Sequence, residues 1–472
     1  MMKRTGLLLL LACAAAAATL SLPATAFDLQ TSEASLSPDA IPFALYEQRR
    51  RSNPLQHPAP EQRPDGLRTD PLPSPAAVHV TFMHINDLYE IIPSGSLGGV
   101  ARAGAVLKRL EALNPGRTRS VLAGDLFSPS ALSTVPVNGV PFNGKQMVAC
   151  MNAMGLDVAT LGNHETDVKV DEFTARLSES EFPWVCANAL NFDYPNLQKE
   201  GVLMHFNGSG AAAGKSASVG IWGVTYDSNN KAYQSYTNFS TTLSIAAEQV
   251  AAMQAARADV VVALTHLPYW HDETLTQTVS GIDIVMGGHE HKRIQIVSPG
   301  LAPIYKADSN VQSAWVHDIF VDPSLPQTDP QRLVIQSVLV AIDSSITPDP
   351  DLAKVVDTWV SAAFAGFEEA GFHPAAPLAT PSVDLVGNNE VIFAQATVLT
   401  NLLNLAMLEE CAKYASASFV VPPIDATLFN AGAIRIDDTI PAGTVMTQYD
   451  AIRISPYLNA VAVVNVTGAM LL

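Results

Sequence analysis

The stretch Leu156-Asp-Val-Ala-Thr-Leu-Gly-Asn-His-Glu-Thr-Asp167 contains the pattern that decides the fold. Its apolar β-type run, residues 156–161, ends directly in the polar fragment Gly162-Asn-His-Glu165. Other short apolar runs along the chain end in the same way, in Asp or His. In open α/β sheets the ligand site lies beyond the carboxyl ends of the strands. We therefore expect these polar fragments to meet at one edge of a sheet.

The side chains of these fragments are suited to metal binding. Carboxylate, amide oxygen and imidazole are ligands for Zn, Mn or Fe, and two such ions roughly 3.5–4 Å apart form a clamp for in-line attack on a phosphorus ester. Any one of these residues alone is more often a capped turn or a buried structural histidine, but the ordered set favours a binuclear metal site. The remaining fragments are Asn86-Asp87-Leu88-Tyr89, Gly124-Asp125, Thr265-His266 and Gly287-Gly288-His289-Glu290-His291.

Predicted strands and helices alternate from residue 77 to about residue 323, which indicates a layered α/β domain with strands buried on both faces. A second, smaller domain is expected at 349–472, with helices at 349–370 and 394–414 and strand-like runs at 426–429 and 460–466. In the first domain the strands are expected at 78–85, 120–123, 156–161, 184–186, 219–222, 260–264 and 282–286, and the helices at 98–110, 145–154, 170–177 and 243–258.

The N-terminal region has the features of a secretory signal peptide. Lys3 and Arg4 precede a weakly apolar run, and Ala24-Thr25-Ala26 offers a cleavage point, so residues 1–26 are expected to be removed and the protein to be secreted or extracytoplasmic. A membrane anchor is the alternative, but the run is short, rich in Ala and ended by Pro23. No later stretch is long enough to span a bilayer. Residues 27–76 are rich in proline and are predicted to be a linker.

Composition and charge narrow the class of partner. Of the 472 residues, 48% are hydrophobic and 15% charged, which is typical of a folded protein with more than one domain. Loss of Lys3 and Arg4 would change the formal charge from −18 to −20. This charge would repel a nucleic acid backbone, so we expect a small phosphoester and no nucleic acid as the partner. The oligomeric state does not follow from the sequence.

The order of the fragments resembles the calcineurin-type metallophosphoesterases, and among them the 5′-nucleotidase and UDP-sugar hydrolase family. That family's run of Asn-Asp-x-His, Gly-Gly-Val-Ala-Arg, Gly-Asp, Gly-Asn-His-Glu-x-Asp, Thr-His and Gly-Gly-His-x-His is matched in order by residues 86–291. The resemblance implies an α/β/β/α metallophosphoesterase domain followed by an α+β 5′-nucleotidase C-terminal domain. This second domain is expected to be incomplete, because the family's second stacking aromatic lies past Leu472.

The resemblance also implies roles for the residues of the first domain. His164 would protonate the leaving oxygen or stabilise the transition state, and Asp167 would hold the imidazole in the useful tautomer. For Asp167 a helix cap before Val168 is the alternative. Asp125 would bridge the two metals, Asp87 and His291 would complete the first, and Asn163, His266 and His289 would bind the second.

In the second domain, Asn430-Ala-Gly-Ala-Ile-Arg435 and Ser455-Pro-Tyr-Leu-Asn459 resemble family loops that contact substrate. The resemblance implies a nucleotide substrate. Arg435 would bind its phosphate, Asn430 would contact a base edge or its own loop, and Tyr457 would stack on the base. An ordinary aromatic packed under a turn is the alternative for Tyr457. The stretch 391–397 lacks the Arg that the family has there, which favours another small phosphoester as the alternative substrate.

Tyr89 departs from the family pattern, which has a first-site His at this position. A phenol is a poor ligand near neutral pH, so the first metal is expected to be held weakly or completed by water. We therefore expect two divalent ions, Zn, Mn or similar, as cofactors. Tyr89 puts the binding of the second ion in question. A third hypothesis for the function is a catalytically weak binding protein on the same fold.

Overall fold

A computed structural model of the protein describes residues 76–414, 424–457 and 461–466. These residues fall into two compact units, one within Leu55–Ala363 and the other within Phe364–Leu472, and the boundary lies inside α8, Pro350–Glu369. The predicted signal peptide and most of the predicted linker lie outside the described residues. Within the described part of the chain, no helix is long and apolar enough to cross a membrane.

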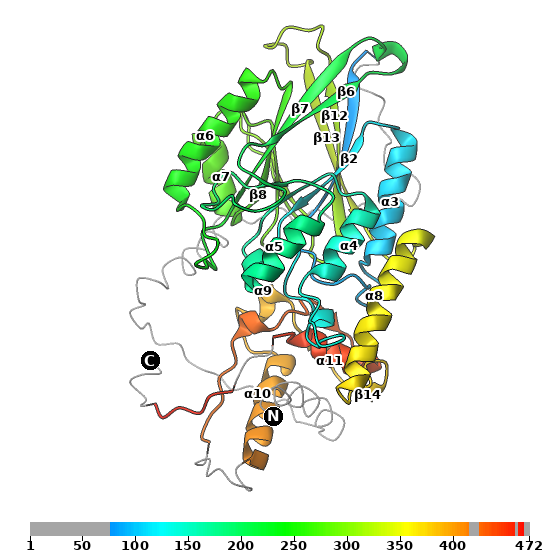
Figure 1. Ribbon diagram of the computed structural model, residues 1–472, viewed down its shortest axis with the longest axis vertical. Helices are drawn as coiled ribbons and strands as arrows, with labels where there is room; N and C mark the ends of the chain where they lie inside the picture. Colours follow the sequence, from blue (N-terminus) through cyan, green and yellow to red (C-terminus); the bar gives the residue numbers. More distant parts are fainter. Residues whose placement is uncertain (1–75, 415–423, 458–460, 467–472) are drawn as a thin grey trace. The chain divides into compact units, whose positions relative to one another are not determined.

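The first unit is built on two large sheets (Figure 1). In the seven-stranded sheet, β1 to β5 run parallel, while β12 and β13 add antiparallel strands at one edge. In spatial order its strands are β13 Leu333–Ala341, β12 Ser313–Val321, β1 Val78–Ile85, β2 Thr118–Ala123, β3 Val158–Thr160, β4 Trp184–Val185 and β5 Leu197–Gln198.

The second sheet has six strands, of which β7, β8, β9 and β11 are parallel and β6 and β10 are antiparallel edge strands. All seven residues of β8 are buried, which explains its almost unbroken apolar sequence. In spatial order the strands are β10 Ile294–Ile296, β11 Ile304–Lys306, β9 Ile284–Gly287, β8 Val260–His266, β7 Ser216–Thr225 and β6 Val202–Asn207.

The two sheets pack face to face, and one apolar cluster contains side chains from both, such as Phe82 and Val121 of one and Val219 and Val262 of the other. Helices cover the outer faces (Figure 1). On the seven-stranded side these are α3 Val100–Leu113, α4 Lys145–Met154 and α5 Val170–Glu179, and on the other side α6 Phe239–Ala255 and α7 Tyr269–Thr278. The predicted α/β/β/α layering is therefore confirmed.

The seven-stranded sheet continues past residue 323, where the sequence analysis places the end of the first domain. β13 pairs with β12 along its whole length, from Leu333 opposite Val321 to Ala341 opposite Ser313. Most residues of β13 are half-buried, and its sequence interrupts the apolar run with Gln336 and Ser337. For that reason its sequence marks a strand less clearly than that of β8 does.

The second unit is a smaller α+β structure with its own apolar cluster, which includes Leu385, Leu399, Leu403, Ile434 and Ile436. Two short antiparallel pairs, β14 with β17 and β15 with β16, supply its strands. Its elements after α8 are β14 Pro377–Ala379, β15 Leu385–Val386, α9 Asn389–Ile392, α10 Val398–Tyr414, η6 Ala431–Ala433, β16 Thr439–Ile440, β17 Met446–Thr447 and α11 Gln448–Ile454.

Two strand predictions in this unit are wrong. Residues 426–429 form neither strand nor helix, and residues 461–466 form no strand either. Val461, Val463, Val464 and Val466 are largely exposed, so the alternation of apolar residues there reflects no buried face. Position 460 lies outside the described residues.

Candidate metal centre

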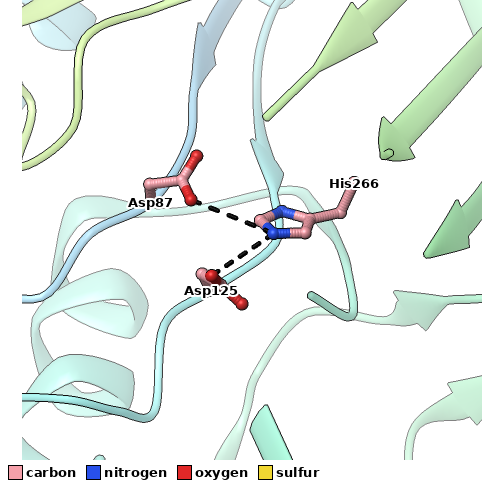
Figure 2. Close-up of side chains that lie close together, drawn as sticks. All are labelled: Asp87, Asp125 and His266. Carbon is pink, nitrogen blue, oxygen red and sulfur yellow. Dashed lines mark ion pairs between the residues drawn. The ribbon is translucent and has the colours of Figure 1, made fainter. Parts of the chain in front are cut away.

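The strand ends bring the predicted metal ligands of the first unit to one place. Asp87 follows β1, Asp125 follows β2, and His266 is the last residue of β8 in the other sheet. Figure 2 shows these three side chains pointing toward one another. One ligand atom from each lies within 4.8 Å of the other two, and all three residues are buried. The edge where the two sheets meet therefore gathers two carboxylates around one imidazole.

The orientation of His266 leaves one ring nitrogen facing the carboxylates. Its Nδ1 lies 2.7 Å from the carbonyl oxygen of Ala123, which fixes that nitrogen as the donor. Among the described residues its buried Nε2 has no hydrogen-bond partner, and it lies 3.3 Å from Asp125 Oδ2 and 3.9 Å from Asp87 Oδ1. A metal-bound histidine is usually held in this way by its other nitrogen. An orphaned, buried nitrogen aimed at two carboxylates fits a divalent cation.

Asn163 and His289 lie beside this cluster. Asn163 Oδ1 is 3.2 Å from His289 Nδ1, and the rings of His266 and His289 are 5.2 Å apart, nearly perpendicular. The backbone N–H of His289 donates to Asp87 Oδ2 at 2.8 Å. The structure thus brings together the side chains that the sequence analysis assigns to the second metal. Their role as ligands stays a prediction.

The residues assigned to the first metal surround Tyr89. His291 Nε2 lies 3.4 Å from Asp87 Oδ1. The phenol oxygen of Tyr89 lies 2.8 Å from His291 Nε2, 2.8 Å from Asp125 Oδ2 and 3.2 Å from Asp87 Oδ1. The residue that departs from the family pattern is therefore in direct contact with all three predicted ligands of that position.

The backbone at the site is held in unusual conformations. Asp87, Asp125, His289 and His291 all have positive φ, at 51°, 60°, 93° and 60°. Left-handed conformations of residues other than glycine cluster at functional sites, where the surrounding structure holds them. A side chain at Gly162 would place its Cβ 2.1 Å from Asp125 Oδ1, so this position must stay bare for Asp125 to keep its orientation.

The charges at the site favour a bound cation. Burial alone would lower the pKa of His266, but the carboxylates of Asp125 and Asp87 outweigh it and raise that pKa to about 10. Burial would raise the pKa of Asp87, but His266 and His291 lower it to about 2. The two carboxylates therefore attract positive charge strongly enough to override burial, and a metal ion would supply that charge.

The side chains of the predicted catalytic pair are in contact, and their catalytic role stays a prediction. His164 Nδ1 lies 2.7 Å from Asp167 Oδ2, and the backbone N–H of His164 donates to Asp125 Oδ1 at 2.8 Å. Asp167 ends the short helix η4 Glu165–Asp167, while the N-cap of α5 is Lys169, so the alternative role of Asp167 as the cap of that helix is wrong. Asn229, which the sequence analysis missed, donates to Asp167 Oδ1 at 2.6 Å and to the carbonyl oxygen of Asn163 at 2.8 Å.

Glu165 is a further supporting residue that sequence reasoning did not single out. Its fully buried carboxyl accepts hydrogen bonds from the backbone N–H groups of Leu126 and Gly162, each at 2.5 Å, and from that of Asp125 at 3.2 Å. Burial raises the pKa of Glu165 to about 8, and the nearby Asp125 adds to the shift. The sequence signal that could have identified Glu165 was its position directly after His164 in the fragment Gly162-Asn-His-Glu165.

A buried ammonium also supports the loops of the site. Lys306, at the end of β11, is fully buried, and its Nζ lies 2.6 Å from Glu290 Oε2, 2.8 Å from Asp272 Oδ2 and 2.5 Å from the carbonyl oxygen of Leu267. Burial would lower the pKa of Lys306, but Asp272 and Glu290 raise it above its ordinary value. Leu267 follows His266, and Glu290 lies between His289 and His291. One side chain thus ties together both histidine-bearing loops.

The predicted substrate residues belong to the second unit. Asn430 caps η6, and its side chain accepts from the N–H of Gly432 at 3.0 Å, which agrees with a contact to its own loop. The backbone N–H of Arg435 donates to the carbonyl oxygen of Ile454, and Tyr457 is half-buried. The roles of Asn430, Arg435 and Tyr457 toward substrate stay predictions.

Comparisons with known proteins agree with this fold. The family model described as calcineurin-like phosphoesterase matches residues 80–293, and the model described as 5′-nucleotidase, C-terminal domain, matches residues 382–472. The chain therefore belongs to the calcineurin-like phosphoesterases that carry a 5′-nucleotidase C-terminal domain.

Particular relatives give the extent of the similarity. The 5′-nucleotidase of Homo sapiens is 24% identical over 316 residues, which are 61% of this chain and 53% of that protein. The trifunctional nucleotide phosphoesterase YfkN of Bacillus subtilis is 23% identical over 450 residues, 86% of this chain and 28% of that protein. The chain thus spans about half or less of these relatives. The crystal structure of a 5′-nucleotidase precursor from Thermus thermophilus shares the fold, with a TM-score of 0.61, 19% identity, and coverage of 80% of this chain and 74% of that one.

Proposed function

We propose that this protein is a secreted, metal-dependent phosphomonoesterase that hydrolyses 5′-nucleotides or related nucleotide phosphoesters. The observation that carries the proposal is the buried His266 Nε2, which has no hydrogen-bond partner in the part of the chain that the structure describes and faces Asp87 and Asp125. Relatives named 5′-nucleotidase, from Homo sapiens and from the venom of Gloydius brevicauda, support the substrate class.

In the proposed site, Asp125 is the residue that would be shared between two ions. Asp87 and His291 would hold one, and Asn163, His266 and His289 the other. When bound, such ions lower the pKa of a shared water and neutralise charge on the phosphoryl oxygens. The negative charge and burial of the site favour their binding.

The catalytic pair would act on the leaving group. Asp167 Oδ2 would accept a hydrogen bond from the Nδ1–H group of His164. The other ring nitrogen, Nε2, would then be the one that holds or delivers a proton at the leaving oxygen. Asn229 holds Asp167 from the other side. The backbone bond from His164 to Asp125 fixes the pair relative to the proposed metal ligands.

Release of phosphate from AMP, UDP-glucose and an aryl phosphate, with Zn or Mn supplied, tests the proposal. We expect AMP to be the best substrate and Asp125→Asn to lose activity and bound metal together. Equal, feeble rates on all three substrates would remove the nucleotide assignment. The missing Arg in residues 391–397 favours a second candidate, another small phosphoester, and the same assay with a wider set of phosphomonoesters would identify it.

Secretion is part of the proposal and is supported by the signal-like sequence of residues 1–26. N-terminal sequencing of protein recovered from outside the cytoplasm is expected to begin at Phe27. Recovery of the intact N-terminus from the cytoplasm would contradict it.

A further inference from the structure

The segment 226–236 is bound to the fragment that carries the predicted catalytic pair, residues 162–168. We call this segment the strap. It follows β7, so it leaves the six-stranded sheet at the end where the proposed site lies. The phenol oxygen of Tyr233 lies 2.6 Å from the carbonyl oxygen of Val168 and 3.0 Å from that of Thr166. Hydrogen bonds therefore join the strap to a fragment that is far away in the sequence.

Asn229 is the strap residue that contacts the catalytic pair itself. Its Nδ2 donates to Asp167 Oδ1 at 2.6 Å and to the carbonyl oxygen of Asn163 at 2.8 Å. Its Oδ1 accepts from Lys231 Nζ at 2.6 Å. Because the amide nitrogen has two protons and the amide oxygen has none, only this orientation of the amide satisfies all three neighbours. The side chain of Asn229 is thus held in one orientation.

The backbone of Asn229 is held as well. Its φ is 53°, in the left-handed region that asparagine adopts more readily than most residues do. Its carbonyl oxygen accepts from the hydroxyl group of Thr166 at 2.8 Å. Left-handed residues other than glycine persist where the surrounding structure holds them, and they cluster at functional sites. Both the backbone and the side chain of Asn229 are therefore fixed relative to the catalytic fragment.

These contacts extend the catalytic pair into a chain of four side chains, Lys231, Asn229, Asp167 and His164. One carboxylate oxygen of Asp167 faces His164 Nδ1 and the other accepts from Asn229, so the carboxylate cannot turn without losing a hydrogen bond. The side chains of His164 and Asp167 are 20% and 21% exposed. Water can therefore solvate this carboxylate in other orientations once Asn229 is removed. Asn229 limits these orientations to the one that contacts the imidazole.

We propose that Asn229 is a positioning residue that keeps the catalytic pair aimed at the leaving oxygen, with Lys231 holding its amide in place. The inference rests on the proposed function and narrows its substrate class to phosphate esters of alkyl alcohols, such as the 5′-oxygen of a ribose. Proton delivery to the leaving oxygen contributes most where that oxygen would otherwise leave as a strongly basic alkoxide. A nitrophenolate leaves without a proton, so its ester does not depend on the chain.

The step in which Asn229 matters is the cleavage of the ester. A water oxygen forms a bond to phosphorus, the bond from phosphorus to the leaving oxygen breaks, and this oxygen takes the proton from His164 Nε2. The proton that the water gives up balances the one that the imidazole loses. An imidazole that is turned away from the leaving oxygen cannot make this transfer, although the phosphoryl group is bound as before.

The test compares kcat and KM for AMP and for 4-nitrophenyl phosphate, with zinc or manganese supplied. Asn229→Gly removes the amide, and glycine accepts the positive φ without strain. We expect it to lower kcat for AMP by about 10–100-fold and kcat for 4-nitrophenyl phosphate by less than about threefold, with KM and metal content unchanged. Lys231→Met should act in the same direction by about threefold, because the amide then loses its third partner.

Tyr233→Phe is the matched control. It removes hydrogen bonds between the strap and the same fragment, but Tyr233 donates to backbone carbonyls and not to the carboxylate of Asp167. It should leave the ratio of the two kcat values unchanged. A residue that acts through Asp167 also has no further effect once Asp167 is gone, so Asp167→Ala with Asn229→Gly should match Asp167→Ala alone.

Three results would overturn the inference. The first is an equal loss of kcat on both substrates in Asn229→Gly, and the second is a parallel loss of bound metal, since either would mean that Asn229 only stabilises the fragment. The third is a Tyr233→Phe variant with the same change in the ratio of kcat values, because the strap as a whole would then be responsible.

Crystal structures of the wild type and the variants separate this inference from the proposed function. We expect the carboxylate of Asp167 to turn away from His164 in Asn229→Gly and to keep its contact in Tyr233→Phe. A wild type that hydrolyses no phosphoester would refute the proposed function. An Asp167 that keeps its place in Asn229→Gly would refute only the positioning role.

Discussion

Replacing Lys306 by Met removes the buried ammonium that joins the two histidine-bearing loops. Lys306 is fully buried, and its Nζ contacts two carboxylates and a backbone carbonyl within 2.8 Å. Breaking a buried ion pair by deleting one partner costs about 3–5 kcal/mol, because the other charge stays buried. Loss of a residue that orients metal ligands typically weakens metal binding by about 10–100-fold. We expect both effects in Lys306→Met.

Urea unfolding of the metal-free protein, followed by circular dichroism, would measure the first effect, and zinc titration against a competing chelator the second. The double variant Lys306→Met with Glu290→Gln removes one of the stranded carboxylates. It should recover part of the stability, but not the zinc affinity, since the loops remain untied.

Lys215→Met is the matched control. Lys215 also pairs with a carboxylate, Asp322 at 2.7 Å, but its side chain is partly exposed, and it directly precedes β7, at the opposite end of that strand from the residue paired with His266. A partly exposed pair contributes about 1 kcal/mol or less, so we expect a small loss of stability and unchanged zinc affinity. Zinc affinity that is unchanged in Lys306→Met, or lowered equally in Lys215→Met, would refute the reasoning.

Other substitutions and conditions test separate parts of the structure. Gly162→Ala should cost about 1–3 kcal/mol and weaken metal binding, because its Cβ would press on Asp125; equal metal affinity would contradict this. Asp167→Asn should lower kcat by at least about tenfold at constant metal content, and unchanged kcat would exclude its role. Burial lowers the pKa of His84 to about 3. Burial, together with the neighbouring His84, lowers the pKa of His317 well below its usual value. Between pH 7 and pH 5 the unfolded chain binds a proton at His84 that the folded chain does not, so the free energy of unfolding should fall by about 2 kcal/mol on this account. His317 acts in the same direction, and His317→Gln should reduce the slope.

Most of the parallel strands and their helices could be predicted because their sequence patterns are strong, whereas the short parallel strands β5 and β11 were not predicted. β1 and α4 have the predicted bounds, 78–85 and 145–154, since both are apolar runs or amphipathic segments with clear ends. The edge strand β6 and the helix α7 were missed. α7 has the polar sequence Tyr-Trp-His-Asp-Glu-Thr-Leu-Thr-Gln-Thr, whose few apolar residues give little helical periodicity.

The residues of the site also divide into those that the sequence predicts and those that it does not. Residues that follow strand ends could be predicted to converge, because parallel strands direct their carboxyl ends to one edge. Lys306, Asn229 and Asn310 could not, since each contacts the centre only through tertiary packing between segments far apart in the sequence. A lysine at the end of an apolar strand carries no local signal that it will be buried against two carboxylates.

Anomalous diffraction from crystals of metal-loaded protein tests the central claim most directly. Two ions about 3.5–4 Å apart are predicted, with Asp125 bound to both. Density for ions elsewhere, and none within coordination distance of Asp87, Asp125 and His266, would contradict the account.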